Sequence, residues 1–303
     1  MIVTADRPKI LLIGCDGQVG WELQRTLGII GEVVATSLCG GYGPALDLLD
    51  RHAVTAMIQR IRPDFIINAA AHTAVDKAEA EAEVELSHQL NAEAPEQLGI
   101  LAAEQGATLI HYSTDFIFSG NTSKPYREEE ATGPLSVYGE TKLDGEQRVL
   151  ASGANALIFR TSWVYGNHGF NFMNTMMRLF KERDQLSVVD DQIGAPTWSR
   201  MIAEATAQIV NQLRLDPADS ARLQGIYHLT AAGETSWYGF ACRIRELMDV
   251  ECNIQAIPTH EYPTPARRPA YSVLDNTKLE ETFGLKMPEW QASLKLCMED
   301  RSH

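Results

Sequence analysis

The chain has 303 residues, of which 45% are hydrophobic and 22% charged, the balance of a soluble globular protein with a sizeable core. Its formal net charge of −14 disfavours non-specific binding to nucleic acid or to an anionic membrane. The sequence contains neither a signal-peptide pattern nor an apolar stretch of membrane-spanning length. Five scattered cysteines without a C-x-x-C pair make neither a disulfide framework nor a zinc site, so we expect a reducing cytoplasm.

The first half of the chain alternates short apolar runs with longer segments of helical pattern. Such runs predict strands of a parallel sheet that is covered on both faces, and the segments between them predict helices. This alternation is typical of an α/β fold with a doubly wound, Rossmann-like parallel sheet. The predicted strands are 9–14, 32–36, 64–70, 108–114 and 156–162, and the predicted helices are 19–29, 51–60, 91–105 and 138–151.

After Gly166 the pattern becomes less regular, and four prolines in 257–272 predict a mostly non-helical segment there. We expect a smaller, irregular α+β lobe over the open end of the sheet. The predicted elements are helices at 171–183, 199–213 and 235–248, an extended segment at 186–197 and a strand at 225–230. The predicted domains are a dinucleotide-binding domain formed by 1–168 with roughly 190–230 returning to it, and a substrate-binding lobe formed by 169–189 and 231–303.

Three glycines follow the first predicted strand and open the first predicted helix. Gly14 would allow a tight turn, Gly17 would let backbone N–H groups approach a pyrophosphate, and Gly20 would let the helix pack closely on the sheet. The start of a helix favours bound phosphate because its N–H groups carry partial positive charge. This spacing, in this place, indicates a dinucleotide site.

The end of the second predicted strand bears on the choice of cofactor. An acidic residue there would hold the adenosine ribose 2′-hydroxyl, but the strand ends with Thr36 and Ser37. The missing carboxylate removes a repulsion that would act on a 2′-phosphate, although no cation follows before Arg51. We therefore expect NADPH as the cofactor, with NADH also usable.

Two further segments lie where ligands of α/β folds bind. Ala71, His72 and Thr73 follow the third predicted strand, where small residues let a cofactor lie close, and we assign His72 contact only. The fourth predicted strand ends with Thr114 and Asp115 at the carboxyl edge of the sheet.

Tyr138 and Lys142 lie four positions apart at the start of a predicted helix, so their side chains share one face. Reduction of a ketone creates an alkoxide that needs a proton, and a phenol can supply it. A nearby ammonium favours the phenolate, so we expect Lys142 to lower the pKa of Tyr138. Thr114 would orient and polarise the carbonyl, which makes Thr114, Tyr138 and Lys142 the candidate catalytic residues.

These motifs together resemble the extended short-chain dehydrogenase/reductases. More narrowly, "GQVGWELQ", "NAAAHTAVDKAE", "HYSTDFIFSG", "VYGETKLDGE", "DQIGAPT" and "PTPARRP" are similar to segments of the dTDP-4-dehydrorhamnose reductase family, in the same order. The resemblance extends from about Lys9 to the C-terminal helix. It implies NAD(P)H-dependent reduction of dTDP-4-dehydro-β-L-rhamnose to dTDP-β-L-rhamnose, the last step in making the activated sugar for cell-surface polysaccharide.

The resemblance also implies roles for individual residues. It places Asp115 and Trp163 at the substrate, and Arg267 and Arg268 suit the pyrophosphate of a sugar nucleotide. It further implies a homodimer and, in some relatives, a structural magnesium ion, for which this sequence offers no ligand set that we can name. The implied cofactor-binding residues are Gly14, Gly17, Gln18, Val19, Gly20, Ser37, Asp47, Leu48, Ala71, His72, Thr73, Tyr138 and Lys142.

Two other functions stay open at this stage. A sugar-nucleotide epimerase or dehydratase would use the same tyrosine and lysine, but dehydratases place Asp-Glu after the threonine, whereas this chain has Asp115 and Phe116. The non-catalytic regulatory subunit of methionine adenosyltransferase also resembles this family. The intact Thr114, Tyr138 and Lys142 speak against a purely binding role.

Overall fold

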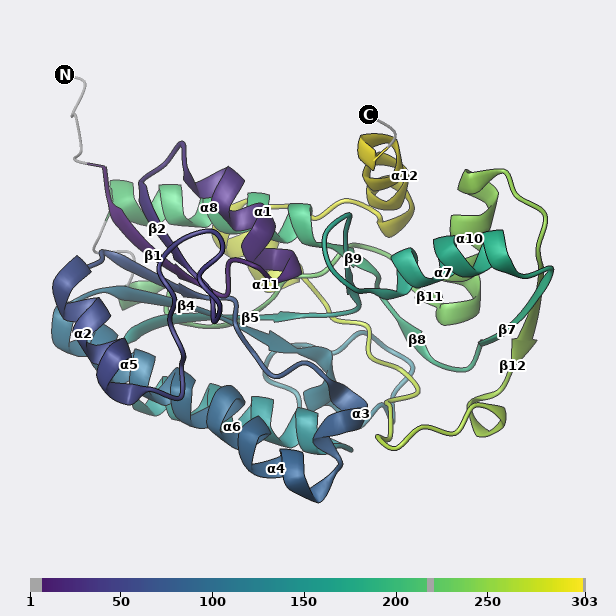
Figure 1. The fold of residues 1–303 in the computed structure, drawn as a ribbon, viewed down its shortest axis with the longest axis horizontal. Coiled ribbons are helices and arrows are strands. Elements are labelled where there is room, and N and C mark those ends of the chain that lie inside the picture. The colour runs from purple at the N-terminus through teal and green to yellow at the C-terminus, as the bar shows by residue number, and fades with distance from the viewer. Residues whose placement is uncertain (1–6, 217–220, 302–303) are drawn as a thin grey trace.

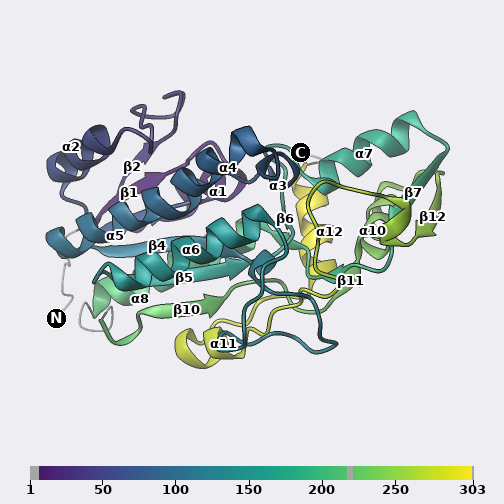
Figure 2. The ribbon, with the colours of Figure 1, turned by 90° about the horizontal axis from the view of Figure 1, so that it is seen from below.

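The computed structural model describes residues 7–216 and 221–301, so the parts of the predicted ranges at 1–6, 217–220 and 302–303 lie outside the described residues. The described chain contains a six-stranded sheet in the order β10-β5-β4-β3-β1-β2, with all neighbours parallel. Figure 2 shows β10 beside β5 at one edge and β2 at the other. The strands are β1 (Lys9–Ile13), β2 (Glu32–Thr36), β3 (Phe65–Asn68), β4 (Thr108–Thr114), β5 (Asn155–Thr161) and β10 (Gly225–His228).

Helices cover both faces of this sheet, which confirms the predicted doubly wound α/β fold (Figure 1). Successive residues of a strand point to opposite faces, so Ile10 and Leu12 join one apolar core while Leu11 and Ile13 join the other. The first core is closed by α1 (Gln18–Leu27), α8 (Ser199–Leu215) and α11 (Thr277–Phe283), and the second by α2 (Arg51–Ile61), α5 (Ala94–Gln105) and α6 (Val137–Ala151).

A second group of helices and short strands lies beyond one end of the sheet (Figure 1). Its aromatic and methionine side chains, among them Met173, Phe240 and Trp290, form a separate core. Strand β12 pairs in parallel with β7, although no strand was predicted at 253–257. The elements are β6 (Val164–Tyr165), α7 (Phe172–Glu182), β7 (Gln185–Val189), β8 (Ile193–Gly194), β9 (Thr197–Trp198), β11 (Thr235–Ser236), α10 (Trp237–Met248), β12 (Asn253–Ile257), a 3-10 turn at Thr259–Glu261 and α12 (Trp290–Arg301).

The expected start of the fourth helix, at residue 91, was wrong. Helical structure begins earlier, with α3 (Val75–Ala78) and α4 (Glu81–His88), and runs through the π-helical turn η1 (Gln89–Glu93) into α5. A π-turn adds a residue to the helical repeat and so shifts the apolar face. The apolar pattern before residue 94 therefore does not continue the pattern of α5.

The chain crosses between the sheet and the second group more than once, because α8 and β10 return to the sheet after β6 to β9 have left it. The two predicted domains stay a prediction. Across residues 7–216 and 221–301, helices of the length and apolar character required for membrane crossing are absent.

Candidate active site

The turn after β1 is built by glycine. Gly14 has a φ of +80°, and a Cβ there would lie 2.7 Å from the backbone nitrogen of Ala70. A Cβ at Gly20 would collide with the carbonyl oxygen of Gly14. Both positions therefore require glycine, as expected for a tight turn and a closely packed helix. The backbone N–H groups of Gly14 and Cys15 donate to the Thr36 carbonyl at 2.9 and 3.0 Å, which ties this turn to β2.

The start of α1 is open to a ligand. Gly17 is the N-cap residue, no side chain caps the helix, and the first turn contains no acidic residue. A Cβ at Gly17 would meet only the Gly14 oxygen, at 3.4 Å. Uncapped N–H groups beside an unfilled Cβ position suit a dinucleotide pyrophosphate. Gln18 and Val19 begin this helix, although the Gln18 side chain is occupied, because its Oε1 accepts from Asn171 at 2.9 Å.

The predicted adenosine contacts lie around the end of β2. Ser37 is buried, and its hydroxyl accepts from the Gly40 N–H at 3.1 Å. Asp47 is exposed and accepts from the Leu49 N–H at 2.9 Å, whereas Leu48 is 6% exposed and belongs to the core beneath. Only Asp47 thus presents a side chain to solvent in this group.

The loop after β3 is fastened to the helices that follow it. His72 donates its N–H to Asn91 Oδ1 at 2.8 Å, and its ring Nδ1 lies 2.8 Å from the Ser87 hydroxyl. Its Nε2 lies 3.4 Å from a carboxylate oxygen of Glu83. The ring is therefore held within the protein, while Ala71 and Thr73, on either side, carry small side chains beside the proposed cofactor path.

Tyr138 and Lys142 share one face of α6, as predicted, and both face the end of β4. Ser136 caps the helix by accepting from the Gly139 N–H at 3.2 Å. The Tyr138 ring lies edge-on to Phe116, with 5.6 Å between the centroids. Lys142 is 2% exposed and donates from Nζ to the Tyr112 carbonyl at 2.7 Å.

The expected effect of Lys142 on Tyr138 was wrong for this structure. Burial raises the pKa of Tyr138 to about 12, with a smaller upward contribution from the Asp115 charge, and contact with the Thr114 hydroxyl opposes the rise. Burial also lowers the pKa of Lys142 to about 8, which Glu146 opposes. The Lys142 amine is directed at β4, so desolvation of the phenol outweighs attraction by the ammonium.

Thr114 and Asp115 form a small buried network at the carboxyl end of β4. The Thr114 hydroxyl donates to Asp115 Oδ1 at 3.1 Å and accepts from the Phe116 N–H at 3.2 Å. Ser162, at the end of β5, donates to the other carboxylate oxygen of Asp115 at 3.0 Å. Burial raises the pKa of Asp115 to about 6, and contacts with the hydroxyls of Ser272, Ser162 and Thr114 oppose it.

Trp163 follows Ser162 with a φ of +46°, a left-handed conformation that is rare for a bulky residue. Its ring stacks on Trp237 at a centroid distance of 3.5 Å and an interplanar angle of 4°. A Cβ at Gly194 would collide with the Trp163 ring, so glycine makes room for it. An unusual backbone conformation at a site of this kind is often functional.

The two predicted arginines differ. Arg267 is exposed, whereas Arg268 is half-buried and binds Asp76 with two nitrogens, at 3.1 and 2.8 Å. Arg268 also contacts Thr264 and donates to the Ala266 carbonyl at 3.0 Å. The Arg268 guanidinium thus joins the loop to α3, and its assignment to the substrate pyrophosphate stays a prediction.

Three buried polar residues that support the site are not among the residues predicted from the sequence. Asn91, in the π-turn η1, binds the His72 backbone on both sides and donates to Thr141 of α6 at 3.2 Å. Ser162 holds Asp115, and His111 contacts Lys142 at 3.3 Å. Nothing local in the sequence distinguishes these residues from ordinary core polar groups, since each depends on contacts distant along the chain.

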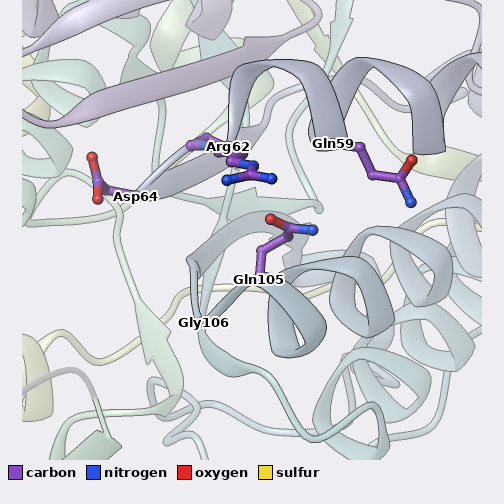
Figure 3. Close-up of a pocket in the computed structure, with 6 residues that line it drawn as sticks. Gln59, Arg62, Asp64, Gln105 and Gly106 are labelled. Carbon is purple, nitrogen blue, oxygen red and sulfur yellow. The ribbon is translucent and has the colours of Figure 1, made fainter.

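A surface hollow of about 570 Å³ lies at the amino-terminal ends of β3 and β4, at the other end of the strands from the candidate site (Figure 3). Arg62, from the end of α2, and Gln105, from the end of α5, extend into the same space. The lining residues are Gln59, Arg62, Pro63, Asp64, Gln105 and Gly106, and none of the predicted site residues is among them. We do not associate this hollow with catalysis.

The magnesium ion that the resemblance implies stays a prediction. Within the described part of the chain, no three His, Cys, Asp or Glu side chains lie close enough to share a metal. Glu22 and Asp300 do converge, but Arg200 lies between them at 3.1 Å from an oxygen of each. The Arg200 guanidinium thus balances these two carboxylates.

The fold and the site define a class: a Rossmann-like α/β protein with a glycine turn after the first strand and a partly buried tyrosine beside a buried lysine, as in the short-chain dehydrogenase/reductases. Residues 8–302 match the model of the RmlD substrate binding domain family. The chain belongs to that family, which confirms the family expected from the motifs.

Similar proteins agree over nearly the whole length. The dTDP-4-dehydrorhamnose reductase of Escherichia coli strain K12 is 45% identical over 303 residues, covering 96% of this chain and 97% of that protein. The crystal structure of a dTDP-4-dehydrorhamnose reductase from Clostridium acetobutylicum is 38% identical with a TM-score of 0.88, covering 97% of this chain and all of that one (100%). The enzyme from Bacillus anthracis, solved in complex with NADP, is 33% identical with a TM-score of 0.88, covering 97% and 99%.

Proposed function

We propose that this protein is an NAD(P)H-dependent oxidoreductase that reduces the 4-keto group of dTDP-4-dehydro-β-L-rhamnose to give dTDP-β-L-rhamnose. The observation that carries the proposal is the placement of Tyr138 and Lys142. Both are directed from one face of α6 at the end of β4, beside Thr114. The relatives named above support the choice of substrate.

The chain offers a place for the nicotinamide cofactor. The open N-terminus of α1 would hold the pyrophosphate, with Gly14, Gly17 and Gly20 allowing the close approach, and Asp47 lies toward the adenosine end. Ala71 to Thr73 would line the path toward Tyr138 and Lys142. The bound cofactor supplies the hydride, and we propose NADPH as the preferred form, with NADH also used.

Residues at the end of β4 would supply a proton to the substrate oxygen and orient the carbonyl group. Because burial raises the pKa of Tyr138 to about 12, the phenol is fully protonated at neutral pH and can donate to the oxygen that becomes negative. Thr114 contacts Tyr138 and would orient the carbonyl. Asp115 accepts a hydrogen bond from the Thr114 hydroxyl. The Trp163 ring, which stacks on Trp237, would contact the sugar. Arg267 is a free-standing cation suited to the substrate pyrophosphate.

The deciding experiment is product analysis. Purified protein is mixed with dTDP-4-dehydro-β-L-rhamnose and either NADPH or NADH, and the sugar nucleotide is identified by chromatography and NMR. We expect oxidation of one cofactor for each dTDP-β-L-rhamnose formed, at a higher kcat/KM with NADPH. No turnover with either cofactor would refute the function, and an epimerised or dehydrated product without net cofactor oxidation would reassign it.

We further propose that the protein is a cytoplasmic homodimer that binds neither nucleic acid nor membranes and contributes to cell-surface polysaccharide. The net charge of −14 supports the absence of polyanionic partners. The homodimer is what the resemblance to the family implies. Light scattering coupled to size-exclusion chromatography tests the dimer, and a mass near 33.5 kDa would exclude it.

A further inference from the structure

His111 lies in the middle of β4, and the proposed reaction gives its ring no part. It is fully buried, and both ring nitrogens have partners. Nε2 lies 3.3 Å from Lys142 Nζ, and Nδ1 lies 3.2 Å from Asn68 Nδ2. Asn68, 1% exposed at the end of β3, accepts from the Ala70 N–H at 3.1 Å through Oδ1. A buried chain of hydrogen bonds therefore connects Ala70, Asn68, His111 and Lys142.

The positions of the protons in this chain of hydrogen bonds follow from the backbone N–H of Ala70. The Ala70 N–H can only donate, so Asn68 presents its oxygen to Ala70 and its amide nitrogen to His111. That amide nitrogen can only donate, so Nδ1 of His111 accepts and carries no proton. A neutral imidazole then carries its proton on Nε2, which faces Lys142. To accept this N–H, Lys142 Nζ must have a lone pair.

We propose, on the basis of the reductase function proposed above, that Asn68 and His111 are positioning residues that hold Lys142 as a neutral amine in the cofactor-free protein. One hydrogen of this amine is donated to the Tyr112 carbonyl at 2.7 Å. An ammonium would need His111 Nε2 as an acceptor, which moves the ring proton to Nδ1. Asn68 would then have to turn its oxygen to His111, and the Ala70 N–H would lose that acceptor.

The chain of hydrogen bonds connects the protonation state of Lys142 to the nucleotide end of the site. Ala70 packs directly on the glycine turn, because its nitrogen lies 2.7 Å from the Cβ position that Gly14 lacks. The next residues, 71–73, line the proposed cofactor path. A cofactor that displaces the backbone at Ala70 would release the Asn68 oxygen and allow Lys142 to take up a proton. Protonation of Lys142 would then accompany cofactor binding.

The groups around Lys142 are consistent with a neutral amine. Burial lowers the pKa of Lys142 to about 8, which by itself leaves most of the amine protonated at pH 7, so the His111 proton on Nε2 must lower it further. Burial lowers the pKa of His111 well below its usual value, which makes the ring neutral. Glu146, one turn along α6, favours the ammonium, but Arg160 of β5 binds that carboxylate at 2.7 Å. Tyr138 lies on the helix itself and Asp115 follows β4. Glu79, after α3, accepts from the Val137 N–H at 2.8 Å, and His88 of α4 and Glu96 of α5 bind Asp144 and Arg148 on the outer side of α6.

The first test is the ring tautomer of His111, measured by 15N NMR on cofactor-free protein labelled in histidine at pH 7. The ring nitrogen shifts separate the Nε2–H, Nδ1–H and doubly protonated forms, and His111→Gln identifies the signals that belong to His111. We expect the Nε2–H form. An Nδ1–H or doubly protonated ring would overturn the proposal, and this outcome does not depend on any variant that must fold.

The second test is Asn68→Asp. A carboxylate only accepts, so it can serve the Ala70 N–H and an Nδ1–H of His111 together, and Nε2 becomes free to accept from an ammonium. We expect the tautomer to switch to Nδ1–H and the pKa of Lys142, followed by NMR of labelled lysine, to rise by about one unit or more. An unchanged tautomer would overturn the proposal.

Gln212→Glu, on the exposed side of α8, is the matched control, because it adds the same charge far from the hydrogen-bond chain. It should leave the His111 tautomer and the pKa of Lys142 unchanged. All readouts are made without cofactor or substrate. Failure of the proposed reductase activity would therefore leave these results intact, and the reverse also holds.

Discussion

Tyr138 is the residue on which the proposed chemistry depends most directly. Its hydroxyl is desolvated and contacts Thr114, and its raised pKa of about 12 keeps it protonated at neutral pH, ready to donate. Tyr138→Phe should lower kcat at least ~100-fold while leaving the Kd for NADPH nearly unchanged, because only the donor is lost. Steady-state kinetics and cofactor fluorescence measure the two quantities.

Tyr227→Phe is the control for this substitution. Tyr227 donates to the Leu223 carbonyl at 2.8 Å, on β10 and away from the site, so its loss should leave kcat within about twofold. A Tyr138→Phe protein that retains full turnover would contradict the role of proton donor.

Asp115 should make stability depend on pH. Burial raises its folded-state pKa to about 6 from an ordinary value of 3.8, so the folded protein binds this proton more tightly than the unfolded chain. The resulting stabilisation is complete below pH ~4 and is lost as pH rises through about 6, an effect of about 3 kcal/mol.

Asp115→Asn should remove this contribution. The free energy of unfolding of the original protein, relative to that of Asp115→Asn, should fall between pH 4 and 6 and then level off. Denaturant unfolding of both proteins at several pH values measures the difference. A difference that stays constant with pH would show that Asp115 does not titrate in this range.

Helix α6 is fixed to the sheet by a buried ion pair. Arg160 of β5 binds Glu146 with two nitrogens, and the two side chains are 3% and 1% exposed. Glu146→Gln leaves a buried guanidinium without its charge partner and should cost about 3–5 kcal/mol in the free energy of unfolding. The exposed pair Arg178–Glu182 is the comparison, since Glu182→Gln should cost no more than ~0.5 kcal/mol. Equal costs in urea unfolding would refute the special role of the buried pair.

The turn before α1 separates two functions of glycine. Gly20→Ala should destabilise the protein because its methyl group collides with the Gly14 carbonyl, whereas Gly17→Ala meets only one atom at 3.4 Å and should fold normally. If the Gly17 position lies against the pyrophosphate, Gly17→Ala should weaken NADPH binding about tenfold or more with little change in Tm. Thermal unfolding and NADPH titration of both variants test this, and unchanged affinity in Gly17→Ala would move the cofactor elsewhere.

The two parts of the molecule meet at the start of α1. Gln18 accepts from Asn171, the N-cap of α7, and His168 stacks on Trp21 with 4.2 Å between the centroids. A cofactor held by α1 should therefore stabilise α7 as well. At 100 times Kd, NADPH should add about 2.7 kcal/mol to the free energy of unfolding.

Hydrogen exchange with and without NADPH measures this coupling. We expect slower exchange in both α1 and α7, with the surface helix α11 as the internal reference that should change little. Protection confined to α1 would show that the second group of elements responds independently of the first.

Most of the sheet could be predicted from local sequence, because a strand covered on both faces must be apolar throughout, and runs such as "KILLI" show this without any long-range information. It also determined the glycine turn and the shared face of Tyr138 and Lys142, since each depends only on local spacing. Strand β12 could not be foreseen, because its pairing with β7 joins residues about seventy positions apart.

The pKa values and the hydrogen-bond partners of the site residues depend on the three-dimensional fold. Lys142 could be placed one turn after Tyr138 from the sequence, yet its amine binds Tyr112 and His111 of a different element, and burial then raises rather than lowers the pKa of Tyr138. Arg268 likewise had the charge for a pyrophosphate but is bound to Asp76, 192 residues earlier. Spacing along the chain fixes the direction of a side chain, whereas desolvation and pairing depend on what the rest of the fold brings against it.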